Sequence, residues 1–148
     1  MRLSLIGMSG SGKSHWSIKL AESGFHRFCC DDLIESELGS ELLTEDGTAV
    51  DIGEWMGFPF EPQYEEREST YLRIERKVLN DILTEIDDRT LHQDRRIVID
   101  TTGSVIYTGE EILGLLRLHT KVVHLATPPG VKEEMLKIYV ANPRPILW

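Results

Sequence analysis

Residues 7–14 read GMSGSGKS and directly follow the apolar run RLSLI at residues 2–6. The eight residues match the pattern Gly-x-x-x-x-Gly-Lys-Ser/Thr, in which a strand runs into a glycine-rich turn and a helix begins near the lysine. With glycine at its average frequency, chance gives such a match in a chain of this length at about one in a hundred. The stretch therefore predicts a strand, a phosphate-binding loop and a helix in direct succession.

Each fixed position of this loop has a chemical role. Gly10 and Gly12 permit backbone angles that turn successive N–H groups toward a phosphate, and the following helix adds its positive N-terminus. Lys13 is expected to reach the β- and γ-phosphates of a nucleotide, and the Ser14 hydroxyl to bind Mg²⁺. The expected nucleotide contacts are Gly7, Ser9, Gly10, Ser11, Gly12, Lys13, Ser14 and His15, with the helix surface as the alternative for His15.

A second stretch, IVIDTTG at residues 97–103, ends a β-branched run in a single carboxylate. In a parallel α/β sheet the carboxyl ends of the strands line the ligand crevice. We therefore expect Asp100 beside Ser14, where it holds Mg²⁺ directly or through water. The alternative is a turn cap, because aspartate is common after strands. Thr101 and Thr102 are expected to hydrogen-bond to an acceptor hydroxyl or to a water on Mg²⁺.

Strand-like and helix-like segments alternate along the chain. The β-rich runs are RLSLIG (2–7), FHRFCC (25–30), RIVID (96–100) and KVVHLA (121–126). Helical patterns cover residues 13–22, 32–38, 64–87, 108–119 and 130–140. This alternation predicts a three-layer α/β/α fold with a parallel sheet covered on both faces. Asp32 is the expected N-cap of the helix at 32–38, and Thr108 that of the helix at 108–119.

Residues 40–62, rich in glycine, proline and acidic residues, interrupt this alternation. We expect them to form a mobile flap on the acceptor side of the sheet, with a short helix near DIGEWMG (51–57). Two alternatives stay open for Trp55 and Phe58, which either anchor the flap by apolar packing or stack on a substrate ring.

The composition argues against several classes of partner. With 16 Lys and Arg against 25 Asp and Glu, the formal net charge is −9, which disfavours binding to nucleic acid by bulk attraction. No apolar stretch reaches the roughly 18–20 residues that a membrane span needs. Cys29 and Cys30 are adjacent and supply neither a disulfide framework nor a four-ligand zinc site. A cytoplasmic protein without nucleic-acid or membrane partners is the expectation.

Together these motifs resemble the shikimate kinase family of small P-loop phosphotransferases, over nearly the whole chain. Besides the phosphate loop, four segments are similar to motifs of the family. DDLIESELG (31–39) is similar to Asp-x-x-Ile-Glu-x-x-x-Gly, and YLRIERKVL (71–79) is similar to Phe-Arg-x-x-Glu-x-x-Val-Leu. TGSV (102–105) is similar to the end of Gly-Gly-Gly-Ser-Val, and PRPIL (143–147) is similar to the Arg-Pro-Leu-Leu of the lid. The resemblance implies a P-loop kinase fold with strand order 2-3-1-4, whose fifth strand is absent from this chain. It also implies ATP and Mg²⁺ as cofactors.

The resemblance further implies roles for individual residues. Arg144 faces the ATP phosphates, Asp31 acts as general base or hydroxyl ligand for the acceptor, and Gly103 belongs to the acceptor-binding turn. Asp31 also suits the alternative of a helix cap.

The departures from the family pattern lie on the acceptor side. The family's Asp-x-Asp is Cys29-Cys30-Asp31 here, and Thr101 and Thr102 replace the first two glycines of the turn. The family's shikimate-binding arginine aligns with Leu72, and Arg73 is one position away. One position is about a 100° rotation on a helix, so Arg73 is the candidate acceptor contact if the helix start is shifted.

The sequence thus predicts one P-loop kinase-like domain over residues 1–148, with an acceptor-side flap at 40–62 and the start of a truncated lid at 141–148. The expected activity is Mg²⁺-ATP-dependent phosphoryl transfer to a hydroxyl of a small metabolite by a monomer. The expected site residues are Lys13, Asp31 and Arg144 for catalysis, Asp31, Arg73, Thr101, Thr102 and Gly103 for the acceptor, and Ser14 and Asp100 for the metal. Two alternatives stay open: a nucleoside or nucleotide kinase, and a nucleotide-binding module without acceptor turnover.

Overall fold

The computed structural model describes residues 1–88 and 96–141 and contains a parallel sheet of four strands. The strands are β1 (Arg2–Ile6), β2 (His26–Cys29), β3 (Ile97–Asp100) and β4 (Lys121–His124). Their order in the sheet is β2-β3-β1-β4, with every neighbouring pair parallel. The predicted fold class and strand order are confirmed, and each strand lies within its predicted β-rich run.

The residues of β3 alternate between two layers of helices, because successive side chains of a strand point to opposite faces. Ile97 and Ile99 are fully buried in the main apolar core. Asp100 points to the other face, where it meets Ser17 of α1 (Lys13–Glu22). All four side chains of β3 are buried, as expected for a parallel strand that is covered on both faces.

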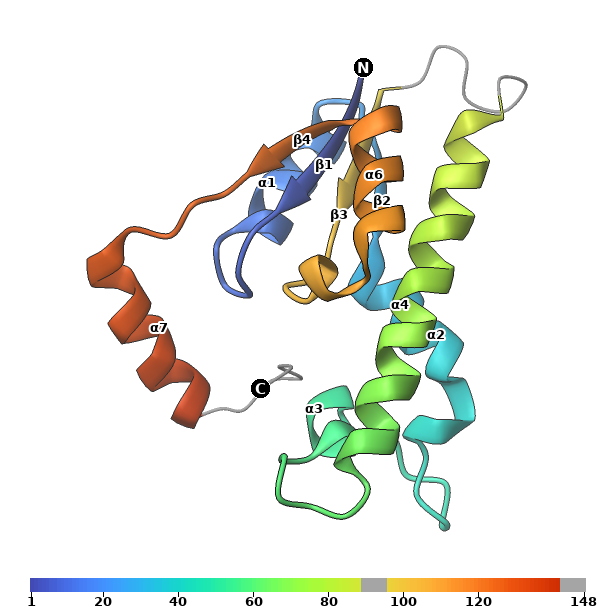
Figure 1. Ribbon diagram of the computed structural model, residues 1–148, viewed down its shortest axis with the longest axis vertical. Coiled ribbons are helices and arrows are strands. Elements are labelled where there is room, and N and C mark those ends of the chain that lie inside the picture. Colours follow the sequence, from blue (N-terminus) through green and yellow to red (C-terminus); the bar gives the residue numbers. More distant parts are fainter. Residues whose placement is uncertain (89–95, 142–148) are drawn as a thin grey trace.

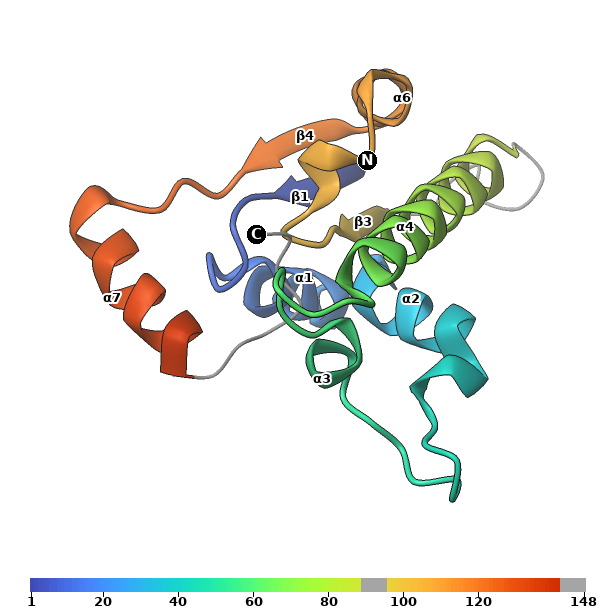
Figure 2. The same cartoon turned by 60° about the horizontal axis from the view of Figure 1, so that its bottom comes forward.

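Helices cover both faces of the sheet (Figures 1 and 2). The helices are α1, α2 (Cys30–Leu38), α3 (Ile52–Met56), α4 (Tyr64–Asp87), α6 (Glu110–His119) and α7 (Pro129–Ala141), with short 3-10 helices η1 (Gly39–Leu42) and η2 (Val105–Tyr107). The long helix α4 packs against α2 and α6 and buries one apolar face in the core. In both views α7 stands away from the sheet.

Two predicted helix caps are wrong. The second helix begins at Cys30, so Asp31 and Asp32 lie in its first turn, and its N-cap is Cys29 without a side-chain cap. The two acidic residues instead favour the helix through its positive N-terminal end. Thr108 precedes the N-cap of α6, which is a glycine, and its hydroxyl donates to the carbonyl of Val105 at 2.6 Å.

Residues 40–62 contain the predicted short helix, α3. Trp55 is 7% exposed, and Arg67 of α4 donates to its carbonyl and lies over its ring, 5.7 Å from the centroid. Apolar packing, one of the two alternatives for Trp55, is therefore what the structure contains. Phe58 lies at the surface and stacks on a neighbouring phenylalanine with centroids 5.4 Å apart.

Part of the predicted organisation lies outside the described residues. This holds for Arg144, the expected phosphate ligand, and for residues 142–148 of the expected lid. Within the described part of the chain, no helix is both long and apolar enough to cross a membrane.

The packing of α4 leads to a prediction for stability. Leu79 is fully buried in the core, so we expect Leu79→Ala to lower the free energy of unfolding by about 2–5 kcal/mol through lost burial and a residual cavity. Leu118→Ala removes the same atoms from a side chain that is 75% exposed and should change the free energy of unfolding by less than about 0.5 kcal/mol. Urea unfolding followed by circular dichroism measures both. Equal effects of the two substitutions would contradict the packing described.

Candidate functional site

The loop between β1 and α1 has the backbone form of a phosphate cradle. Gly10 and Gly12 adopt φ angles of 78° and 93°, in the region that glycine enters without strain. The Ser11 N–H donates to the carbonyl of Met8 at 3.1 Å, which closes the turn ahead of the helix. Gly12 is the N-cap of α1, so the positive end of that helix opens into the loop.

Lys13 lies inside this loop and not on the surface of the helix. Its side chain is 6% exposed, and its Nζ donates to the carbonyls of Gly7 and Met8 at 2.8 and 2.9 Å. Burial lowers the pKa of Lys13, while the negative charges of Asp100 and Asp31 raise it. The ammonium group is therefore within electrostatic reach of both carboxylates.

The other predicted loop contacts differ in exposure. Ser14 is exposed, and its carbonyl accepts from the Ser17 hydroxyl at 3.0 Å. His15 is exposed and packs edge-on against Trp16, with ring centroids 5.6 Å apart. The Ser11 Oγ is buried and has no hydrogen-bond partner among the described residues. Ser14 is thus accessible from solvent, and its carbonyl is tied to Ser17.

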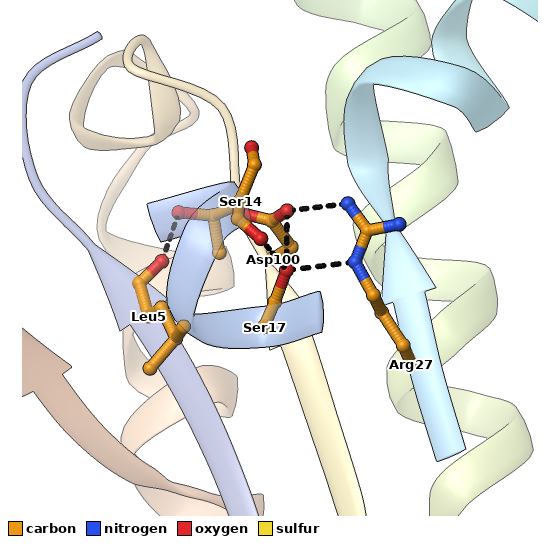
Figure 3. A network of polar contacts seen from close by, with 6 residues as sticks. Leu5, Ser14, Ser17, Arg27 and Asp100 are labelled. Atoms are coloured by element: carbon orange, nitrogen blue, oxygen red, sulfur yellow. Dashed lines mark hydrogen bonds and ion pairs between the residues drawn. The ribbon is translucent and has the colours of Figure 1, made fainter. Parts of the chain in front are cut away.

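Asp100 lies at the end of β3 under the start of α1, and its side chain is 1% exposed (Figure 3). Its Oδ2 accepts from the Ser17 hydroxyl at 2.8 Å and from Nη2 of Arg27 at 2.7 Å. The Nε of Arg27 donates to the Ser17 hydroxyl at 2.7 Å. The three side chains, from β3, α1 and β2, thus form one closed polar network.

Neither Arg27 nor Ser17 was predicted from the sequence as a site residue. A signal for Arg27 was present, because an arginine in the middle of a short apolar strand has to find a partner. In the parallel register Arg27 lies opposite Val98, and Cys29 lies opposite Asp100, so Arg27 and Asp100 project from the same face of neighbouring strands. The pairing of Arg27 with Asp100 could be predicted only with the knowledge that β2 and β3 are neighbours in the sheet.

The residues at this end of the sheet fit a Mg²⁺ ion. The Asp100 Oδ1 is buried and has no hydrogen-bond partner in the described structure, whereas Oδ2 has two. No group of three or more His, Cys, Asp or Glu within residues 1–88 and 96–141 forms a metal cage. A nucleotide-bound Mg²⁺ usually takes one or two ligands from the protein, and phosphate oxygens and water complete its coordination. Asp100 and Ser14 would provide the carboxylate and the hydroxyl.

Asp31 lies in the first turn of α2, with the residue as a whole exposed. Desolvation of its carboxyl and the negative charge of Asp100 raise the pKa of Asp31, and Lys13 opposes them. Asp31 is thus within electrostatic reach of Lys13 and Asp100. A carboxylate in that place is suited to accept a proton from an alcohol that approaches the loop.

Three predicted acceptor contacts receive no support from their surroundings. Arg73 is exposed on α4. Thr101 is fully buried and donates to the carbonyl of Leu5 at 2.7 Å, and Thr102, 2% exposed, donates to the carboxylate of Glu75. Both threonine hydroxyls are thus engaged inside the protein.

Gly103, the last of the five predicted acceptor contacts, lies against the phosphate loop. A Cβ built on Gly103 would lie 2.9 Å from the backbone nitrogen of Ser9. The position therefore requires glycine because of a close approach of two backbones, and not because of an unusual φ angle.

Glu75, on the buried face of α4, lies within the segment YLRIERKVL (71–79) and was not predicted as a site residue. It is 0% exposed and accepts hydrogen bonds from Thr102 and, at 2.9 Å, from the Ser104 hydroxyl. Burial raises the pKa of Glu75 from an ordinary 4.5 to about 7, and the two hydroxyl donors oppose this shift. The signal in the sequence was a glutamate at a position where the helical period places the apolar face.

The raised pKa of Glu75 predicts a pH-dependent stability. The folded state holds the Glu75 proton more tightly than the unfolded chain, so this carboxyl lowers the free energy of unfolding as pH rises from about 4.5 to about 7. Glu75→Gln cannot ionise, and its stability relative to wild type should therefore increase by up to about 3 kcal/mol between pH 4 and pH 8. Chemical unfolding at a series of pH values measures this difference. The exposed Glu66→Gln on the same helix is the control, and parallel profiles of wild type and Glu75→Gln would contradict the assignment.

Known proteins match this chain in a comparison of structures and not in comparisons of sequence. Neither a scan against protein-family models nor a sequence search of curated proteins finds a match. Among solved structures, the shikimate kinase from Acinetobacter baumannii in complex with shikimate is similar, with a TM-score of 0.63 and 25% identity over 99% of this chain and 66% of that one. The enzyme from Bacteroides thetaiotaomicron gives 0.59 and 20% over 93% and 64%, and that from Aquifex aeolicus 0.59 and 22% over 99% and 72%.

The chain thus spans between 64% and 72% of the length of these kinases. The similarity extends over nearly all of this chain, and the strand order agrees with the prediction that the resemblance carried. The protein is structurally similar to shikimate kinases and shares the α/β fold of these enzymes.

Proposed function

We propose that this protein is an ATP-dependent small-molecule kinase that transfers a phosphoryl group to a hydroxyl of a small metabolite with the help of Mg²⁺. The observation that carries the proposal is the Asp100 Oδ1, a buried carboxylate oxygen without a partner among the described residues, within electrostatic reach of Lys13. The similarity to shikimate kinases supports the same class of reaction. A small hydroxylated compound is the acceptor, and ATP and Mg²⁺ are the cofactors.

In this proposal the phosphate loop does most of the work by positioning and charge. The backbone N–H groups of the loop, apart from that of Ser11, which donates to the Met8 carbonyl, hold the β-phosphate. Lys13 leaves the carbonyls of Gly7 and Met8 to reach the β- and γ-phosphates. Ser14 and Asp100 would hold Mg²⁺, which supplies Lewis-acid neutralisation of phosphate charge when bound. Arg27 and Ser17 fix Oδ2 of Asp100 and so direct Oδ1 away from them.

Asp31 is the group proposed for the acceptor. Its carboxylate takes the proton of the acceptor hydroxyl as that oxygen bonds to the γ-phosphorus, while the bond between the γ-phosphorus and the bridging oxygen breaks and ADP leaves. The raised pKa of Asp31 makes it a better proton acceptor than an ordinary aspartate. Arg144, outside the described residues, is proposed to neutralise the transferring phosphoryl group together with Lys13.

A ligand panel tests the proposed function. The shift in melting temperature is measured with ATP and Mg²⁺ alone and then with shikimate, other polyols or nucleosides added, and each combination is also assayed for ADP release. A true acceptor stabilises the protein further and releases ADP. Nucleosides as the stabilising class would indicate a nucleoside kinase. Binding of ATP without turnover of any acceptor would contradict the kinase proposal in favour of a nucleotide-binding module.

Lys13 provides the first prediction from this mechanism. Lys13→Ala should lower phosphoryl transfer by about 100-fold or more, because it removes a preorganised donor from the developing charge. Lys19→Ala is the matched control, since Lys19 is an exposed lysine on the same helix. Initial rates and calorimetric ATP affinities measure both. Normal ATP binding and turnover by Lys13→Ala would exclude the proposed role.

The proposed role of Asp100 as a Mg²⁺ ligand leads to a further prediction. Asp100→Asn removes the carboxylate proposed for Mg²⁺, and the Mg²⁺ concentration at half-maximal activity should rise about tenfold or more. Ser17→Ala removes one partner of Oδ2 and leaves Oδ1 intact, so its Mg²⁺ requirement should shift less. Titration with MgCl₂ at saturating ATP measures both. A folded Asp100→Asn protein with an unchanged Mg²⁺ requirement would exclude Asp100 as a metal ligand.

A further inference from the structure

The turn that follows β3, residues 101–104, connects α4 to the phosphate loop. On one side, the hydroxyls of Thr102 and Ser104 both donate to the carboxylate of Glu75. On the other side, Gly103 lies so close to Ser9 that a Cβ would meet the Ser9 nitrogen at 2.9 Å and its Cβ at 3.2 Å. A displacement of this turn therefore has to move the Ser9 backbone or leave a gap beside it.

The side of the turn that faces α4 is held by a fully buried carboxylate. Glu75 is 0% exposed, and Thr102 is 2% exposed. Removing the acceptor would take one partner from each of the two hydroxyls and leave them the 3.0 Å contact with each other, and polar groups inside a protein are destabilising when they lose a hydrogen-bond partner. The ionisable groups around Glu75 are Asp31 and Cys30 of α2 and Tyr71 and Arg76 of α4.

The start of the turn is fixed independently. The Thr101 hydroxyl donates to the carbonyl of Leu5 at 2.7 Å, and Leu5 pairs with Asp100 in the sheet. The start of the turn is therefore anchored to β1. Its far half is held by the two bonds to Glu75, and also by the Tyr107 N–H, which donates to the Ser104 carbonyl at 2.8 Å. A movement of Gly103 and Ser104 toward α4 or away from it changes the space that is left for Ser9.

We propose that Glu75 is a positioning residue for the phosphate loop, which acts by holding the turn at residues 101–104 at the depth where Gly103 supports Ser9. The effect on nucleotide affinity rests on the proposed function, because it assumes that the loop binds nucleotide phosphate. The position of the loop itself does not rest on that assumption. Glu75 needs no contact with nucleotide or acceptor to have this effect.

The test compares substitutions on one helix. Glu75→Leu fills similar volume but accepts no hydrogen bond, and we expect it to weaken ATP affinity about tenfold, which corresponds to 1.4 kcal/mol. Glu75→Gln keeps an acceptor oxygen and should restore most of that affinity. Leu79→Ala, also buried on α4, lowers stability without touching the turn, so its ATP affinity should stay within about twofold of wild type. Isothermal titration calorimetry of the full chain with ATP and Mg²⁺ measures all three.

A second readout needs no ligand. The backbone amide chemical shifts of residues 9–12, measured by NMR without nucleotide, should change in Glu75→Leu and not in Leu79→Ala. Gly103→Ala should change the same shifts from the other side of the turn. If Glu75→Leu does not fold, Ser104→Ala removes one donor from a half-buried position and takes its place.

The outcomes separate the two proposals. A folded Glu75→Leu or Ser104→Ala protein with wild-type amide shifts at residues 9–12 would overturn the positioning role. Equal loss of affinity in Leu79→Ala and Glu75→Leu would overturn it as well, because global destabilisation would then explain the effect. If wild type binds no ATP while the shifts still respond to Glu75, the proposed function fails and the positioning role stands.

Discussion

The burial of β3 on both faces is the constraint on which the rest of the site depends. This strand lies between β2 and β1, and its two sides are taken up by α1 and by the core under α4 and α6. Its alternation sends two isoleucines into the core and Asp100 to α1, and its end continues into the turn against the phosphate loop. A one-residue slip would exchange these two faces and put a carboxylate into the apolar core. The position of Asp100 at the end of the sheet thus depends on the register of β3.

The fold could be predicted from the sequence because local signals and the global arrangement agree. The glycine pattern at residues 7–14 specifies a strand, a turn and a helix, and helical patterns separate the four β-rich runs. The residues at which helices begin could be predicted less well. The helix of residues 30–38 begins before its acidic pair, because the strand ahead of it stops at Cys29 and the first helical turn accepts carboxylates at its positive end. Caps depend on such local geometry, which the periodicity of side chains does not encode.

The site could be predicted only where a residue acts through its own position in a motif. The phosphate loop belongs to that class. Arg27 and Glu75 do not, because each bonds to a partner distant in sequence, which for Arg27 is Asp100, 73 residues away. Thr101 and Thr102 show the converse limit. Their hydroxyls suggest contacts with a ligand, but in the structure they satisfy a backbone carbonyl and a buried carboxylate, as polar groups in the interior must.

Trp16, two residues after Ser14, gives this arrangement a practical consequence. Its ring is 52% exposed, lies edge-on to His15 and has Lys19 5.4 Å from its centroid. Of the other two tryptophans, Trp55 is buried 39 positions further along the chain and Trp148 lies outside the described residues. The molecule therefore carries an exposed indole in the first turn of the helix that follows its phosphate loop. Its fluorescence is sensitive to the polarity around the indole, so the filling of the loop has a reporter that requires no added label.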